Sequence, residues 1–128
     1  MNEQEQTAGL AATPGYRYAE EVGGRLYLAG QVPHDATGTL VAPGDPHRQA
    51  ARCLENLVTV LTVHDFEIGE VRRMTIHVVG SREDLASAWQ AVSTFFGDDV
   101  PPATLLGVPV LGHHGQLVEI DAEVCRAP

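Results

Sequence analysis

The chain has 128 residues, a length that suits one domain with its own hydrophobic core. Its 17 acidic residues outnumber the 8 basic ones, lysine is absent, and the formal net charge is −9. This balance argues against nucleic-acid binding, which depends on Lys and Arg, and an acidic membrane surface would repel the chain. No apolar run approaches the ~20 residues that span a bilayer.

The N-terminal stretch is polar and lacks the basic-then-apolar order of a signal peptide. We therefore expect a soluble, cytoplasmic protein with a flexible tail over residues 1–13. Residues 14–128 contain no linker, repeat or low-complexity segment, which predicts one domain.

The first elements should form a β-hairpin. Two strand-like runs within residues 16–32 flank Gly23 and Gly24, a pair that tolerates the positive φ angles of a tight turn. A turn-rich stretch follows, up to Pro46.

A helix should begin at Pro46, with Asp45 as its N-cap. The helix is expected to end near His64 or Asp65. Apolar residues at helical spacing predict one buried stripe, which consists of Leu54, Leu57, Val58 and Leu61.

A β-branched strand is predicted over residues 71–79, followed by a second helix. Ser81 with Asp84 forms a capping box, and Gly97 ends the helix. The apolar stripe of this helix consists of Leu85, Ala88, Trp89, Val92 and Phe96.

The last two strand-like runs, residues 103–111 and 117–124, are predicted to pair as a hairpin, with Pro109 at an edge or bulge. The element order is β-β-α-β-α-β-β, which predicts an α+β fold with one sheet and two helices on one face. The other face is then either wet or covered by another subunit. The first run is apolar on both sides, which favours a covering subunit.

The last run alternates apolar and acidic residues, so Glu119, Asp121 and Glu123 would share one face. A solvated face explains this pattern, and so does a carboxylate that takes a proton in a dry interface. Asp121 and Glu123 are expected to pair with Arg72 or Arg73, or to face solvent.

Patterns for metal binding are missing. His113 and His114 are adjacent, so their side chains diverge, and they fit no metal-ligand spacing. Cys53 and Cys125 match no metal spacing either, and we expect reduced, mostly buried thiols. No metal site is predicted.

Five segments together resemble the Rid family of reactive intermediate deaminases, also called endoribonuclease L-PSP-like proteins. They are PGYRYAEEV (14–22), LYLAGQVPHDATGTLV (26–41), QAARCLENLVTVL (49–61), PPATLLGVPVL (101–111) and VEIDAEV (118–124). The resemblance implies a chorismate-mutase-like fold and a homotrimer with ligand clefts between subunits. It also implies hydrolysis of an enamine or imine to a keto acid and ammonia, without a metal or cofactor.

The resemblance also implies roles for single residues. The cleft tyrosine of the family falls on Tyr16, and its C-terminal glutamate falls on Glu119, which would orient or deprotonate the attacking water. The Ser-Gly-Gln turn of the family appears as Ala29, Gly30 and Gln31, so the serine hydroxyl is missing. The backbone at Gly30 would approach the ligand closely.

The substrate-binding arginine of the family is replaced by Ala103. An arginine binds a carboxylate through two hydrogen bonds, and alanine cannot. The resemblance also places Trp89, Leu105 and the backbone at Gly107 near Ala103. Together these residues predict a substrate pocket that is more apolar than is typical of the family.

The leading interpretation is a Rid-like homotrimer that binds a small metabolite and hydrolyses an enamine or imine in an intersubunit cleft. Arg17 and His113 are two residues that could replace the missing arginine. A non-catalytic binding or regulatory trimer is the alternative. An endoribonuclease is the third hypothesis, and the acidic charge disfavours it.

Overall fold

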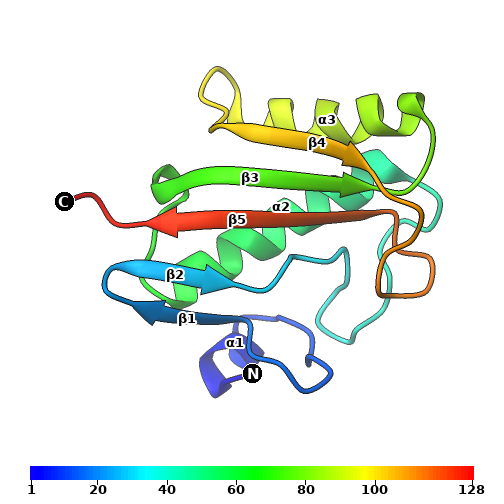
Figure 1. Cartoon of the computed structure of the whole chain (residues 1–128). Helices are drawn as coiled ribbons and strands as arrows, with labels where there is room; N and C mark the ends of the chain where they lie inside the picture. Colours follow the sequence, from blue (N-terminus) through cyan, green and yellow to red (C-terminus); the bar gives the residue numbers. More distant parts are fainter.

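The computed structural model describes residues 1–128 and contains a five-stranded mixed sheet with the strand order β1-β2-β5-β3-β4 (Figure 1). The strands are β1 (Ala19–Val22), β2 (Arg25–Leu28), β3 (Val71–Val78), β4 (Ala103–Gly107) and β5 (Val118–Cys125). The pairs β1–β2, β2–β5 and β3–β5 are antiparallel, whereas β3 and β4 run parallel.

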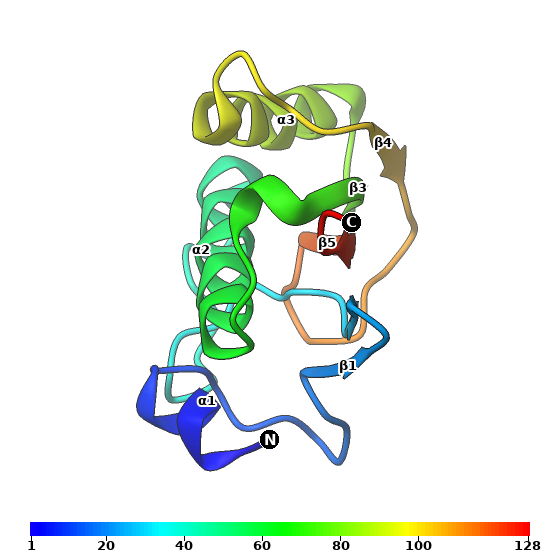
Figure 2. The same ribbon diagram turned by 90° about the vertical axis from the view of Figure 1, so that its left-hand side faces the viewer.

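Two long helices cover one face of the sheet. Helices α2 (Pro46–Val63) and α3 (Arg82–Phe96) lie on the same side of the strands, which confirms the predicted α+β fold class (Figure 2). Side chains buried between these helices and the sheet form the main core. We call the opposite, helix-free side of the sheet the open face. None of the helices is both long and apolar enough to cross a lipid bilayer.

The predicted first hairpin and first long helix are confirmed. Strands β1 and β2 pair around Gly23 and Gly24, which both have positive φ angles. Asp45 is the N-cap of α2, and the helix ends at Val63 with His64 as its C-cap. Local turn and capping chemistry therefore determines these boundaries.

Strand β3 and helix α3 also lie where the sequence predicts them. The Ser81 N–H donates to the Asp84 carboxylate and the Asp84 N–H donates to the Ser81 hydroxyl, which completes the capping box. Gly97 follows the last helical residue with a φ of 64°. This left-handed conformation favours glycine and stops the helix.

The predicted pairing of the last two strands is wrong. Strand β4 pairs with β3 in parallel, and β5 inserts between β2 and β3. A parallel pair needs a crossover connection, and α3 supplies it between β3 and β4. Strand β5 suits the centre of the sheet because Ile120 and Val124 are buried in the core. Pro109 lies beyond the end of β4 and interrupts no ladder.

The N-terminus differs from the flexible tail expected over residues 1–13. A short helix, α1 (Glu3–Thr7), begins with a capping box between Asn2 and Glu5 and contacts α2. Glu5 is only 2% exposed, and its carboxylate lies 2.8 Å from Nε2 of His64 at the end of α2. The two residues are 59 positions apart, so no local pattern could reveal this contact.

The two cysteines have different environments. Cys53 is buried in the core, where burial raises the pKa of its thiol well above the usual value. Cys125 is exposed at the end of β5. Both are free thiols, but the expected burial holds for Cys53 alone.

Replacing Glu5 by Ala should lower the free energy of unfolding by about 1–3 kcal/mol, because the change removes a buried carboxylate–imidazole hydrogen bond. Glu3→Ala is the matched control, since Glu3 is exposed on the same helix, and it should change stability by less than about 0.5 kcal/mol. Urea unfolding followed by circular dichroism measures both values. Equal losses would show that the contact with His64 does not hold α1 in place.

Candidate functional site

The open face carries the acidic side chains of β5 beside residues of β3. Glu119 is opposite His77 in the antiparallel pair. Asp121 is opposite Thr75 in the same ladder. Opposed residues share a side of the sheet, and Ile120 between the two carboxylates is fully buried in the core. The acidic residues of β5 therefore point away from the helices, as their alternation predicts.

Gly30 brings the loop after β2 directly against two of these carboxylates. A Cβ atom on Gly30 would lie 2.6 Å from Oε2 of Glu119 and 2.7 Å from Oδ1 of Asp121. Such distances are shorter than van der Waals contact, so only glycine fits without movement. The backbone at Gly30 has no positive φ, and the requirement for glycine comes from the close approach alone.

Gln116 fixes the Glu119 side chain from another direction. Gln116 is 3% exposed, and its Nε2 donates to Oε1 of Glu119 at 3.3 Å and to the Val118 carbonyl oxygen at 3.0 Å. Its Oε1 accepts the backbone N–H of His113 at 3.2 Å. One buried amide thus links the loop before β5 to the carboxylate and limits the orientations available to Glu119.

Tyr16 lies within electrostatic range of Glu119. Burial raises the pKa of the Tyr16 phenol, and the negative charge of Glu119 raises it further. The phenol is therefore protonated at neutral pH and can donate a hydrogen bond. This segment precedes β1, so the tyrosine comes from a part of the chain distant in sequence from β5.

A pocket of about 80 Å³ opens beside Tyr16 and Gly30. Its walls come from three segments that are far apart in the sequence: residues 11–18, residues 30–38 after β2, and His113 in the loop before β5. Because Gly30 contacts both the pocket and the two carboxylates, the pocket lies next to Glu119.

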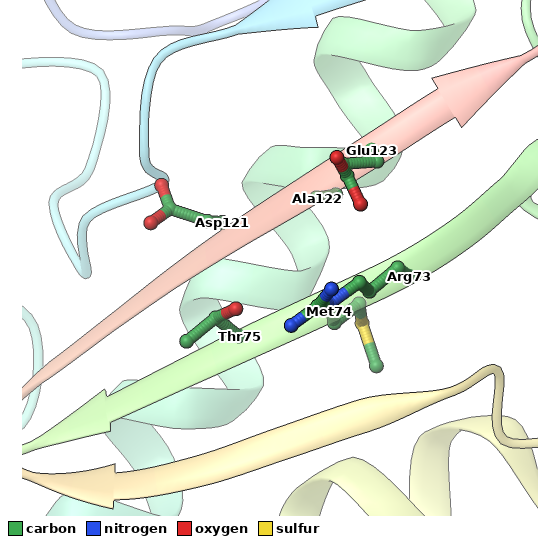
Figure 3. Close-up of a pocket in the computed structure, with 6 residues that line it drawn as sticks. All are labelled: Arg73, Met74, Thr75, Asp121, Ala122 and Glu123. Carbon is green, nitrogen blue, oxygen red and sulfur yellow. The ribbon is translucent and has the colours of Figure 1, made fainter.

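A second hollow, of about 240 Å³, lies on the open face between β3 and β5 (Figure 3). The residues that line it are Arg73, Met74, Thr75, Asp121, Ala122 and Glu123. Glu123 does not pair with Arg72 or Arg73, because its carboxylate lies 3.4 Å from Nη2 of Arg25 on β2. Both partners of this ion pair are about half exposed, so it contributes little to stability.

Strand pairing also brings His77 to the carboxylates. Its Nε2 lies 3.8 Å from Oδ2 of Asp121, and one ligand atom from each of His77, Glu119 and Asp121 lies within 4.8 Å of the others. Imidazole and carboxylate groups can bind divalent metals. All three residues are only partly buried, and exposed carboxylates often gather without a metal, so we assign no ion to them.

Four residues that the resemblance places in the pocket lie elsewhere in the chain. Trp89 on α3 and Leu105 on β4 are partly buried and pack against the core between the helices and the sheet. Ala103 is opposite the buried Met74, on the strand at the edge of the sheet, and Gly107 ends that strand. A single chain does not bring these four residues to the pocket beside Glu119.

The structure does bring together Tyr16, Gly30 and Glu119, the other residues that the resemblance indicates. Ala29 immediately precedes Gly30, and its N–H donates to the carbonyl oxygen of Tyr18. Sequence reasoning did not assign a role to three groups in or near the site, namely His34, His77 and Gln116. Each is a single polar residue that belongs to no sequence motif, so only the tertiary structure reveals its neighbours.

The fold agrees with comparisons to known proteins. A model of the endoribonuclease L-PSP family matches residues 6–125, and the chain therefore belongs to this family, the Rid family. A RutC family protein of Pyrococcus horikoshii is 27% identical over 107 residues, which cover 84% of this chain and 83% of the relative.

Solved structures of family members have the same fold. YyfA of Yersinia pestis, a Rid family protein, is 26% identical with a TM-score of 0.80 and coverage of 90% of each chain. TdcF of E. coli, solved with bound serine, is 23% identical with a TM-score of 0.83, covering 98% of this chain and 97% of TdcF. RidA of an Antarctic Psychrobacter is 22% identical with a TM-score of 0.83, covering 98% of this chain and 100% of RidA. The chorismate-mutase-like fold is confirmed.

Gly30→Ala should lower the free energy of unfolding by about 1 kcal/mol, because the new methyl group overlaps the ends of two carboxylate side chains, which must turn away and give up the hydrogen bond from Gln116 to Glu119. Gly69→Ala is the matched control, since a Cβ atom there meets nothing within 4 Å. Its stability should stay within about 0.5 kcal/mol of the wild type. Thermal and urea unfolding check both variants, and a Gly30→Ala protein as stable as Gly69→Ala would show that the two carboxylates are not held in place at this contact.

Proposed function

We propose that this chain forms a homotrimer that binds a small metabolite between subunits and hydrolyses an imine or enamine. The observation that carries the proposal is the Glu119 carboxylate, which Gln116 and Gly30 hold near the protonated phenol of Tyr16. This group lies on a sheet face that no helix covers. A carboxylate in a fixed position beside a ligand pocket is suited to general-base catalysis.

Apolar side chains on the open face support the homotrimer. Val22 and Tyr27 are 57% and 54% exposed. Tyr27 alternates with the buried Leu26, and Val22 is opposite Arg25, which is on the same side of β2 as Tyr27. Leu106 is 39% exposed and opposite His77, so it also points to the open face. A neighbouring subunit would remove this apolar surface from water, which contributes about 25 cal/mol per Å² buried.

The homotrimer would also complete the cleft. Strand β4 is at the edge of the sheet, and Leu106 on its open face can contact a neighbouring subunit directly. Ala103, Leu105 and Gly107 are opposite Met74, Ile76 and Val78, on the helix side of the strand, so we propose that they and Trp89 shape the cleft from behind the neighbouring strand.

The proposed reaction needs a base for water and a donor for the leaving nitrogen. Glu119 accepts a proton from water while the water oxygen attacks the carbon of the C=N bond. That proton then passes to nitrogen, which gives a carbinolamine. Glu119 next takes the hydroxyl proton of the carbinolamine and delivers it to nitrogen as the C–N bond breaks, so ammonia leaves as the carbonyl forms. One water is consumed for each ammonia, and no oxidant or metal is required. Tyr16 remains protonated throughout and donates a hydrogen bond to the substrate.

Ala103 limits which substrates the cleft can bind. Losing a charged partner for a carboxylate costs roughly 1.5–3 kcal/mol, about ten- to a hundredfold in affinity. TdcF has a similar fold and was solved with bound serine, which supports a small polar metabolite as the ligand class. The missing arginine also favours the second candidate, a trimer that binds a metabolite without catalysis.

An RNA substrate is not proposed, although the family name refers to an endoribonuclease. The net charge of −9 and the absence of lysine disfavour binding to a phosphate backbone. The acidic groups of the open face would repel RNA from the candidate site itself.

Glu119→Gln should reduce ammonia release by about 10²-fold or more, because the amide keeps the shape of the side chain but cannot accept the proton. Glu123→Gln, on the same face of β5 and paired with Arg25, is the matched control and should stay within a few-fold of wild type. The assay follows ammonia over time from imines generated in place by an amino-acid oxidase. Similar losses in both variants would exclude Glu119 as the base. Ligand binding without ammonia release in the wild type would favour the non-catalytic trimer.

Sedimentation velocity at micromolar protein should show one species of about three times the 13.7 kDa chain mass. A specific interface typically buries more than about 1,000 Å², and an interface of that size would keep the trimer assembled at this concentration. Leu106→Glu places a charge on the open face and should produce monomers. Phe95→Glu, at an exposed position on α3, is the control and should remain trimeric. A monomeric wild type would exclude the intersubunit cleft.

A further inference from the structure

We propose that the paired imidazoles of His34 and His113 bind the carboxylate group of a small 2-oxo acid or its imine, in place of the missing arginine. The two rings lie 4.7 Å apart between centroids, at an interplanar angle of 66°. Both rings line the 80 Å³ pocket beside Tyr16 and Gly30. This assignment deepens the proposed function, but binding of the carboxylate does not itself require catalysis.

Buried amides hold the backbones of both histidines in place. Asn56 on α2 is 7% exposed, and its Nδ2 donates to the carbonyl oxygens of Val32 at 2.9 Å and of His34 at 3.0 Å. Gln116 accepts the backbone N–H of His113. The imidazole pair is thus assembled from two distant loops by dedicated side-chain contacts, which reduces the entropy lost when a ligand binds.

The imidazoles are the only groups lining this pocket that can carry a positive charge, since no arginine contributes to its walls. Arg17, the other residue considered as a substitute, pairs with Glu20 and its side chain is 73% exposed. Negative groups lie on two sides of the pocket, and the carboxylate of Glu119 is beyond Gly30. Asp35 is exposed and accepts hydrogen bonds from Thr37 and from the backbone at residue 39.

The size of the pocket favours a small acid. Its volume of about 80 Å³ is well below the roughly 300 Å³ at which sites for larger ligands begin, so a small acid fits best. Gly30 separates the imidazole pair from Glu119. A carboxylate on the imidazoles would therefore direct the adjacent carbon of the ligand past Gly30, toward the carboxylate of Glu119.

Protonation should accompany binding. Burial lowers the pKa of His34, the neighbouring His113 lowers it further, and Asp35 opposes this change in part. The tyrosines of the pocket, Tyr16 and Tyr18, carry no charge at neutral pH because their pKa values are raised. His34 is therefore neutral in the empty pocket at pH 7, and an incoming carboxylate raises its pKa. Binding takes up a proton and strengthens as the pH falls.

Isothermal titration with pyruvate tests this inference. The affinity for pyruvate should rise about tenfold between about pH 7.5 and about pH 6. A change of this size corresponds to the uptake of close to one proton for each pyruvate bound. Titration in two buffers with different heats of ionisation should show proton uptake in the wild type, a result that needs no variant. Pyruvamide, which lacks the negative charge, should show neither effect.

Variants then locate the protonated group. His34→Gln and His113→Gln should each weaken pyruvate binding about tenfold at pH 6 and reduce its pH dependence. His114→Gln is the matched control, because His114 is adjacent in sequence but does not line the pocket. Equal losses with His114→Gln, binding that does not change with pH, or no heat at roughly 10 mM pyruvate would overturn the inference.

The test separates this inference from the proposed hydrolysis. Glu119→Gln should lose ammonia release but keep the pH-dependent binding of pyruvate, because the imidazoles remain. If the wild type binds pyruvate in this way but hydrolyses no imine, the carboxylate site stands and the hydrolase does not. If it hydrolyses imines but binds pyruvate without proton uptake, the hydrolase stands and the imidazole site does not.

Discussion

The rest of the structure depends on the position of β5, because this strand alone joins the two halves of the sheet. It pairs with β2 of the N-terminal hairpin on one side and with β3 of the crossover unit on the other. Its pleat sends Ile120 and Val124 into the core and Glu119 and Asp121 to the open face. The alternation that closes the core therefore also places the carboxylates beside the loop that follows β2, where Gly30 meets them.

Buried side-chain amides position the loops of the candidate site. Gln49 accepts the backbone N–H of Leu117, Asn56 bonds to the backbone at His34, and Gln116 connects the loop of His113 to β5. Each of these three amides is more than nine-tenths buried. A buried amide costs stability unless it is hydrogen-bonded, so the loops cannot move away without leaving polar groups unpaired. This arrangement explains how irregular segments can form a pocket of defined shape.

Short-range signals predicted most elements, because caps and tight turns act within a few residues. Asp45 and Ser81 located both long helices correctly. Strand partners could not be predicted in the same way, since alternation indicates which face of a strand is buried but not which strand lies beside it. The contact of Glu5 with His64 was missed for a related reason, as its partners are distant in sequence. In the site, the family resemblance indicated Tyr16, Gly30 and Glu119, whereas His34 and Gln116 matter only through tertiary neighbours that one sequence does not display.

A crystal structure of the protein with pyruvate at about pH 6 would test the central claim most directly, because it shows the ligand, the subunit arrangement and the carboxylate together. We expect the pyruvate carboxylate within hydrogen-bond distance of His34 and His113, its carbonyl carbon facing Glu119, and β4 of a neighbouring subunit closing the cleft. Pyruvate bound away from the imidazoles, or a Glu119 side chain that faces solvent in the assembled protein, would contradict the claim.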